Sequence, residues 1–161
     1  MNKYLIANFN DYLGSTFCIF HSEVENQWNL TDCVSSNTID PIDGIEKIAV
    51  KIENLSSYDL VTGGSNTVRD LLKERFGNDI RMGEPEGANQ IVEMLRSKKL
   101  TIERRISQDV SDDLNDPQRL ENSRLLKTIG LACRSILNPI YPSSFGGDPI
   151  DEDPYKRFSR W

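Results

Sequence analysis

A glycine-rich turn between an apolar run and an amphipathic segment is the first place where this chain could bind a ligand. Tyr58–Val61 has the composition of a short buried strand, and Gly63 and Gly64 follow it. Ser65 and Asn66 come next, and either can cap a helix. Backbone amides at a helix start attract anions, and glycines let a phosphate approach closely. The stretch therefore predicts either an anion site or a tight capped turn, and the missing Walker lysine and G-x-G-x-x-G pattern favour the turn.

One histidine and three cysteines are the residues that could hold a soft metal. Cys18 and His21 are three positions apart, so on a regular strand their side chains point to opposite faces. Cys33 could reach either one only through the fold. Cys18, His21 and Cys33 are thus the candidate metal ligands, but a small buried thiol and a strand-end imidazole account for them better, and we expect no metal site. With Cys133 the count is odd and the spacing wide, which argues against a disulfide framework.

Hydrophobic periodicity predicts the elements that must position these residues. Three apolar runs near the start favour an antiparallel meander, and helical spacing then alternates with short strand-like runs. The predicted strands are Lys3–Phe9, Thr16–Phe20, Gln27–Val34, Tyr58–Val61 and Ile80–Met82, with helices at Ile42–Leu55, Ser65–Phe76 and Ala88–Lys98. Between the first two runs, residues 8–15 are rich in Asn, Asp and Gly and predict a turn. The predicted fold class is α/β, a mixed sheet with an antiparallel N-terminal meander and βα units, plus a C-terminal helix and an irregular tail.

The pattern changes beyond residue 100. Leu100–Ile106 alternates apolar and polar residues and predicts an edge strand or an extended arm, and the acidic Ser107–Asn115 indicates a linker. Asp116 and Pro117 predict the start of a helix over residues 117–137, which either covers an open side of the sheet or forms a homo-oligomer. We therefore divide the chain into an α/β core domain (1–100), an arm and amphipathic helix (101–138) and a proline-rich irregular tail (139–161).

This order of elements resembles the dinitrogenase iron–molybdenum cofactor-binding family, small ribonuclease-H-like α/β domains that carry or insert metal–sulfur cofactors. The similar segments are the loop and strand from Tyr12 to Phe20, the strand, turn and helix from Asp59 to Leu72, and the helix from Gly87 to Leu95. The resemblance implies a ribonuclease-H-like fold. It also implies a cofactor site at the first loop and the glycine turn, formed by Tyr12, Gly14, Ser15, Gly63, Gly64, Ser65 and Asn66.

A tyrosine stands where the family has its cofactor-binding histidine. Tyr12 occupies that place in the first loop, and tyrosine is a poor substitute for imidazole at a soft metal–sulfur cluster. A metal–sulfur cofactor is therefore implied by the resemblance but not favoured.

A ribonuclease-H-like sheet can also host two-metal catalysis, which needs several carboxylates that converge at strand ends. Asp11, Asp32 and Asp59 are scattered, and Asp59 begins its predicted strand rather than ending it. One histidine supports no Ser–His–Asp set. We therefore expect no catalytic residues and no enzymatic activity.

The last residues combine aromatic and basic side chains. Tyr155, Arg157, Phe158 and Trp161 follow an acidic run and predict a segment that binds a protein partner, with folding back onto the chain's own domain as the alternative.

Composition limits the other partners. The net charge of −6 disfavours a nucleic-acid partner, no apolar run approaches the length of a membrane span, and free thiols favour a cytoplasmic protein. The sequence thus predicts a non-catalytic adaptor or accessory protein that acts through protein–protein contacts. The alternative is a carrier or binder of a metal–sulfur cofactor or a small anionic ligand.

Overall fold

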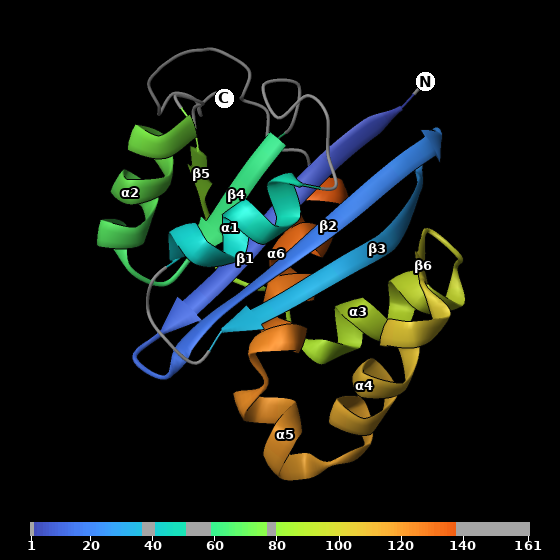
Figure 1. The fold of residues 1–161 in the computed structure, drawn as a ribbon. Coiled ribbons are helices and arrows are strands. Elements are labelled where there is room, and N and C mark those ends of the chain that lie inside the picture. Colours follow the sequence, from blue (N-terminus) through green and yellow to red (C-terminus); the bar gives the residue numbers. More distant parts are fainter. Residues whose placement is uncertain (1, 37–40, 51–58, 77–79, 138–161) are drawn as a thin grey trace, which may run out of the picture.

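Six strands form one mixed sheet in the computed structural model, which describes residues 2–36, 41–50, 59–76 and 80–137 (Figure 1). The strand order is β5-β4-β1-β2-β3-β6. β1, β2 and β3 form an antiparallel meander, whereas β4 runs parallel to β1 and β5, and β6 runs parallel to β3. The strands are β1 (Lys3–Asp11), β2 (Gly14–Val24), β3 (Gln27–Ser36), β4 (Asp59–Gly63), β5 (Ile80–Met82) and β6 (Leu100–Ile102). The predicted α/β fold class is confirmed, while the predicted irregular tail (139–161) lies outside the described residues.

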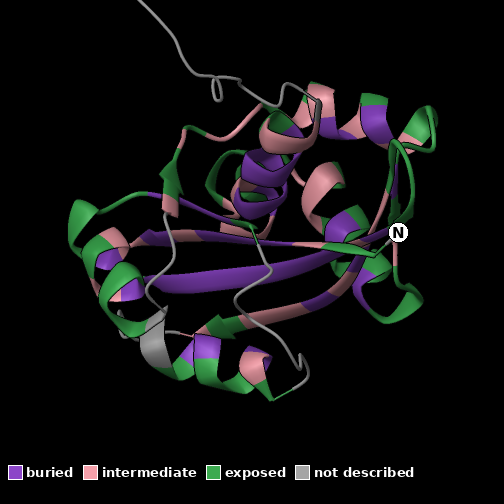
Figure 2. Ribbon diagram, turned by 90° about the horizontal axis from the view of Figure 1, so that it is seen from above, coloured by how far each residue is buried: buried purple, intermediate pink, exposed green. Residues whose placement is uncertain are grey.

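The helices cover both faces of this sheet. In the described part of the chain they are α1 (Pro41–Ala49), α2 (Asn66–Phe76), α3 (Ala88–Arg96), α4 (Arg104–Asn115), α5 (Pro117–Asn122) and α6 (Arg124–Leu137). Side chains of α1 and α2 form one core with the sheet, and those of α3, α4 and α6 form the other. Seen from above, the central strands are buried and the outer helix surfaces are exposed (Figure 2). No helix in the described ranges is long and apolar enough to cross a membrane.

The central strand β1 contributes to both cores. Leu5 and Ala7 belong to the core beneath α6, and Ile6 belongs to the core beneath α1 and α2. All three are at most 2% exposed. A strand that lies between parallel and antiparallel neighbours and is covered on both faces reads as a continuous apolar run, which is why β1 was recognisable in the sequence. Residues 59–61 of the predicted strand Tyr58–Val61 also lie inside the sheet, in β4 between β5 and β1, whereas residue 58 lies outside the described residues.

The first hairpin is longer than predicted. β1 continues to Asp11 and β2 begins at Gly14, so the predicted turn over residues 8–15 is wrong except at its centre. The reason is that two polar residues of β1 are buried and hydrogen-bonded. Asn8 donates to the Thr16 carbonyl oxygen at 2.9 Å, and Asn10 donates to the Gly63 carbonyl oxygen at 2.8 Å.

Residues 104–115 form helix α4, so the predicted extended arm is limited to the short strand β6 and the predicted linker is wrong. Ile106 and Val110 are buried, and Leu114 packs against the same core. These residues are spaced by four, which places them on one face of a helix. The alternation that suggests a strand over Leu100–Ile106 thus ends where a helical period begins.

The predicted helix over residues 117–137 is two helices. Asp116 caps α5 by accepting a hydrogen bond from the Gln118 amide at 3.0 Å, as its position before Pro117 predicts. Ser123 ends α5, and its Oγ accepts the Leu126 amide at 3.1 Å, so it caps α6. The break between the helices lets the chain change direction, so that α6 crosses the sheet.

α6 covers one face of the sheet, which was one of its two predicted roles. Its apolar side packs on β1, β2 and β4, and its buried residues include Leu126, Ile129, Leu131, Ala132 and Cys133. A homo-oligomer through residues 117–137 stays a prediction, but the apolar face that suggested it packs against the sheet of the same chain. The predicted partner-binding residues lie outside the described residues; these are Tyr155, Arg157, Phe158 and Trp161. The helix predicted over Ile42–Leu55 is found as α1 (Pro41–Ala49), and residues 51–55 of that prediction also lie outside the described residues.

Replacing Ile129 with Ala should lower the free energy of unfolding by about 2–5 kcal/mol, because it leaves a cavity between α6 and the sheet. Leu120 on α5 is 37% exposed, so Leu120→Ala is the matched control and should cost less than about 1 kcal/mol. Urea denaturation of both variants checks the difference. Equal midpoints would contradict the packing of α6 described above.

Candidate functional site

Buried neutral side chains join the carboxyl ends of β1 and β4, the edge where ligands bind in sheets of this kind. Asn8 and Thr62 face each other in the β1–β4 register. The Thr62 hydroxyl donates to Asn8 Oδ1 at 2.9 Å, and both residues are at most 1% exposed. A buried amide and hydroxyl cost free energy unless they are paired, and here they pair with each other. The side chains that join the two strands here are therefore polar but uncharged.

The glycine turn after β4 is closed against β1. Gly64 has a φ of +101°, and a Cβ at this position would lie 2.3 Å from the Asn10 carbonyl oxygen. Asn10 Oδ1 accepts the Ser65 amide at 3.3 Å, and Ser65 Oγ accepts the Thr67 amide at 3.0 Å. Two amides that would face an anion thus already have partners. Of the two alternatives for this stretch, the hydrogen bonds favour the tight capped turn, with Asn66 exposed at the start of α2.

The structure separates the residues that the family resemblance grouped in the first loop. Tyr12 is 87% exposed at the tip of the β1–β2 turn. Gly14 lies against Arg124 and the Ser36 carbonyl oxygen, so a Cβ there would clash with both. Ser15 is fully buried and pairs with Asn10 in the β1–β2 register. Because Ser15 lies on β2, β1 separates it from the glycine turn after β4. The cofactor role of these residues stays a prediction.

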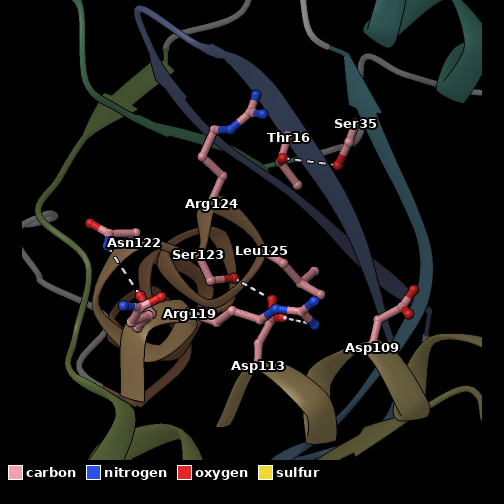
Figure 3. Close-up of a pocket in the computed structure, with 10 residues that line it drawn as sticks. Thr16, Ser35, Asp109, Asp113, Arg119, Asn122, Ser123, Arg124 and Leu125 are labelled. Carbon is pink, nitrogen blue, oxygen red and sulfur yellow. Dashed lines mark hydrogen bonds and ion pairs between the residues drawn. The ribbon is translucent and has the colours of Figure 1, made fainter. Parts of the chain in front are cut away.

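A cleft of about 490 Å³ lies where α4, α5 and the first turn of α6 meet the sheet (Figure 3). Its lining is mainly polar and contains two arginines and two aspartates. The residues that line it are Thr16, Ser35, Asp109, Asp113, Gln118, Arg119, Asn122, Ser123, Arg124 and Leu125. They come from β2, β3 and three helices, and the cleft lies toward the end of the sheet where β1 and β3 finish.

Arg124 joins α6 to this end of the sheet. It donates to the Ser36 carbonyl oxygen at 3.1 Å, and its Nε lies 4.0 Å from Asp11 Oδ1. Its side chain is only 19% exposed. Arg124 is therefore a charge held in a fixed position by the last residues of β1 and β3.

The second arginine is more exposed and faces two carboxylates. Arg119 lies 3.7 Å from Asp113 and 3.6 Å from Asp116, and its side chain is 59% exposed. Asp113 also accepts a 2.6 Å hydrogen bond from Ser123 Oγ. In Figure 3 the side chains of Asp113, Arg119 and Ser123 converge, whereas Arg124 points away from them. The cleft thus holds two separate cationic groups.

Sequence reasoning missed this cleft because its residues were assigned to a linker and to one long helix. The available signal was the second capping residue, Ser123, which marks a new helix start three residues before Leu126.

The candidate metal ligands do not form a joint site. Cys18 belongs to the core beneath α6, whereas His21 stacks on the Tyr4 ring on the other face, with centroids 4.3 Å apart. This confirms that Cys18 and His21 point to opposite faces. Cys33 lies directly opposite Cys18 on the neighbouring strand. Within the described ranges, no group of three or more His, Cys, Asp or Glu side chains could hold a metal ion.

No protein-family model and no curated protein matches the chain, but several solved structures do. The large terminase from a thermophilic bacteriophage aligns with a TM-score of 0.66 at 12% identity, over 84% of this chain and 39% of that one. The nuclease domain of g2p, the large terminase of bacteriophage SPP1, solved with bound Mn, aligns with a TM-score of 0.56 at 13% identity, over 86% and 87% of the two chains. This chain thus spans about two fifths of the thermophilic phage's terminase.

These comparisons correct three expectations. The likeness to ribonuclease-H-like nuclease domains confirms the fold that the family resemblance implied, but it gives no support to the dinitrogenase cofactor-binding family itself. The SPP1 domain is a nuclease, and a nuclease is an enzyme. Its likeness to this chain therefore contradicts the prediction of a non-catalytic adaptor and the prediction of no enzymatic activity. The alternative, a carrier of a metal–sulfur cofactor or small anion, is not favoured either. The error arose because the scattered positions of Asp11, Asp32 and Asp59 were given more weight than the expected ribonuclease-H-like fold, which nuclease domains share.

Gly64→Ala should destabilise the protein by at least about 1–3 kcal/mol, because it combines a positive φ with a backbone clash against Asn10. Gly87→Ala is the matched control: a Cβ at Gly87 meets nothing within 4 Å, and the substitution should change stability by less than about 1 kcal/mol, because losing a glycine N-cap and restricting the unfolded chain have opposite effects. Thermal unfolding of the two variants measures the difference. A neutral Gly64→Ala would show that the turn is not closed against β1.

Proposed function

We propose that this chain acts on nucleic acid as a nuclease-type domain and that the cleft at the start of α6 holds the sugar–phosphate backbone. The observation that carries the proposal is the placement of Arg119 and Arg124 in a polar cleft beside the end of a ribonuclease-H-like sheet. The likeness to a terminase nuclease domain supports the substrate class by analogy of fold.

The chemistry of the cleft suits a phosphodiester. Arginine presents a planar fork of donors that matches phosphate oxygens. Amide and hydroxyl groups supply the other common contacts to a nucleic-acid backbone, and Gln118, Asn122 and Ser35 line the same cleft. Asp113 faces Arg119 and Ser123, so one of the two carboxylates of the cleft is already compensated.

The expectation of no nucleic-acid partner rests on the net charge of −6, and no observation tests it. A negative total charge weakens the long-range attraction of a polyanion, but it does not prevent a local contact in a cleft. Binding through two arginines should therefore be weak at physiological salt and stronger at low ionic strength.

The SPP1 domain was solved with bound Mn, so we ask whether this chain offers the ligands that such a divalent cation needs. Hard divalent cations prefer several carboxylate and water oxygens. At the β1–β4 edge this chain has Asn8, Asn10 and Thr62, which are hydrogen-bonded to each other or to the main chain. These residues do not fit a resident divalent cation, and we derive no step through one.

Arg124→Gln should weaken binding to a labelled oligonucleotide about tenfold, the loss expected for one charged contact of about 1.4 kcal/mol. The slope of log affinity against log salt should also fall by about one. Fluorescence anisotropy with single- and double-stranded DNA and with RNA, at about 50 and 200 mM salt, measures both. Arg69→Gln is the matched control, because it removes the same charge from α2 on the opposite face of the sheet. Equal losses in the two variants would contradict a role for the cleft.

An Arg119→Gln/Arg124→Gln double variant should lower nucleic-acid binding and strand cleavage together, because both require the backbone to be held in the cleft. Denaturing gels of end-labelled substrates, run in parallel with Mn²⁺, Mg²⁺ or a chelator, measure the product. Wild-type protein that neither binds nor cleaves any of these nucleic acids at low salt would overturn the proposed function.

A further inference from the structure

Two cysteines that are 15 residues apart in the sequence meet on neighbouring strands. Cys18 of β2 and Cys33 of β3 are direct partners in the antiparallel register. Their sulfur atoms are 3.5 Å apart, with the Cys18 thiol donating to Cys33. Both are free cysteines, and both side chains lie on the side of the sheet that faces α6 and α4.

The backbone at this pair already has the geometry of a disulfide. Directly opposed residues in antiparallel strands have Cα atoms roughly 4.5–5.5 Å apart, which lies inside the range of about 4.4–6.8 Å that disulfides span. The sulfur atoms need to approach by about 1.5 Å to reach the bond length of about 2.05 Å. Side-chain rotation can supply a shift of this size without a change of register.

The two thiols differ in access. Cys18 is completely buried, and burial together with the neighbouring Cys33 raises the pKa of its thiol well above the usual value. Cys33 is half-buried, and its side chain lies at the border of the same core. An incoming disulfide therefore meets Cys33 first, and Cys18 is placed to resolve the product.

We propose that Cys18 and Cys33 form a cross-strand dithiol that is oxidised reversibly to a disulfide by exchange with a small disulfide such as oxidised glutathione. The Cys33 thiolate attacks one sulfur of the oxidised glutathione, and one glutathione thiolate leaves and takes a proton. Cys18 Sγ then attacks Cys33 Sγ and displaces the second glutathione as a thiolate, which takes up the proton that the Cys18 thiol loses. In total the two cysteines lose two protons and two electrons, and one oxidised glutathione becomes two reduced molecules.

The bond would fasten β3 to β2 next to the irregularity in their pairing at Ile19 and Phe20. β3 also carries β6 and, through Ser36, accepts the hydrogen bond from Arg124. Oxidation would therefore stabilise the strand that lines one side of the cleft, and the melting temperature should rise by several degrees because the closed loop constrains the unfolded chain.

The sequence allows a direct test. No Lys or Arg lies between Lys3 and Lys47, so trypsin leaves Cys18 and Cys33 on one peptide, Tyr4–Lys47. Cys133 falls on a separate peptide and is the internal control: it is buried in α6, and burial raises its pKa to about 12. The full chain is equilibrated in glutathione buffers from fully reduced to fully oxidised, quenched with acid, denatured, alkylated with N-ethylmaleimide and analysed by mass spectrometry.

The expected result is a peptide Tyr4–Lys47 about 2 Da lighter, with neither alkylation nor retained glutathione, while Cys133 remains alkylated. Cleavage after Glu23 or Glu25 separates the two cysteines and should give two peptides joined by a reducible bond. Cys18→Ser should instead retain one glutathione on Cys33, and Cys33→Ser should leave Cys18 reduced.

Three results would overturn the proposal. These are full alkylation of both cysteines in the oxidised buffer, a glutathione trapped on Cys33 of the wild-type chain, and a disulfide that links two chains on a non-reducing gel. A gain in melting temperature on oxidation that persists in Cys18→Ser would equally refute the stabilising effect.

Discussion

The fold depends on burying a central strand on both faces. β1 lies between β4 and β2, and its side chains alternate between two cores. α1 and α2 cover one side, but the other side is completed by α3, α4 and α6, which come from the second half of the described chain. Because α6 packs on strands more than 100 residues earlier, such contacts form only after long stretches of chain have been brought together. The cleft exists because α6 must begin at the edge of the sheet in order to cross it.

β1 and its neighbour β4 carry the polar residues that fix their register. Asn8, Asn10 and Thr62 are buried, so each must find a partner or lose its hydration without compensation. Asn8 and Thr62 are direct neighbours between β1 and β4, and a slip of one residue would separate them and turn every apolar side chain to the wrong face. These residues therefore specify the alignment of β1 with β4, which in turn places the glycine turn after β4 against Asn10.

Local patterns predicted the elements whose periodicity was unbroken. The buried run of β4 and the amphipathic faces of α2 and α3 could be recognised because one period held over the whole element. α4 was missed because three apolar residues, Ile106, Val110 and Leu114, are too few to outweigh its acidic and polar composition. The end of β1 and the start of β2 were missed because asparagine favours turns in a single sequence. Asn8 and Asn10 are stable in the sheet only because their side chains donate to carbonyl oxygens of the neighbouring strands.

The candidate site was less predictable than the fold, since its residues meet only through tertiary contacts. Arg124 and Ser36 are 88 residues apart, and Cys33 faces Cys18 only in the observed register. Neither pairing leaves a spacing that a single sequence could reveal. The glycine turn, in contrast, was found as a local motif, and its hydrogen bonds then favoured the structural one of its two interpretations.

The two arginines of the cleft would contribute differently to a bound backbone. A phosphate near Arg119 has to compete with Asp113 and Asp116, but this side chain is largely exposed and can move toward a ligand at little cost. Arg124 is mostly buried and is fixed by a carbonyl as well as a carboxylate, so it loses less side-chain entropy on binding and offers one defined direction for its remaining donors. Solvent screens the charge of Arg119 more strongly than that of Arg124. Arg119 therefore governs the salt-dependent approach of an anion, and Arg124 governs where the bound phosphate comes to rest relative to the sheet.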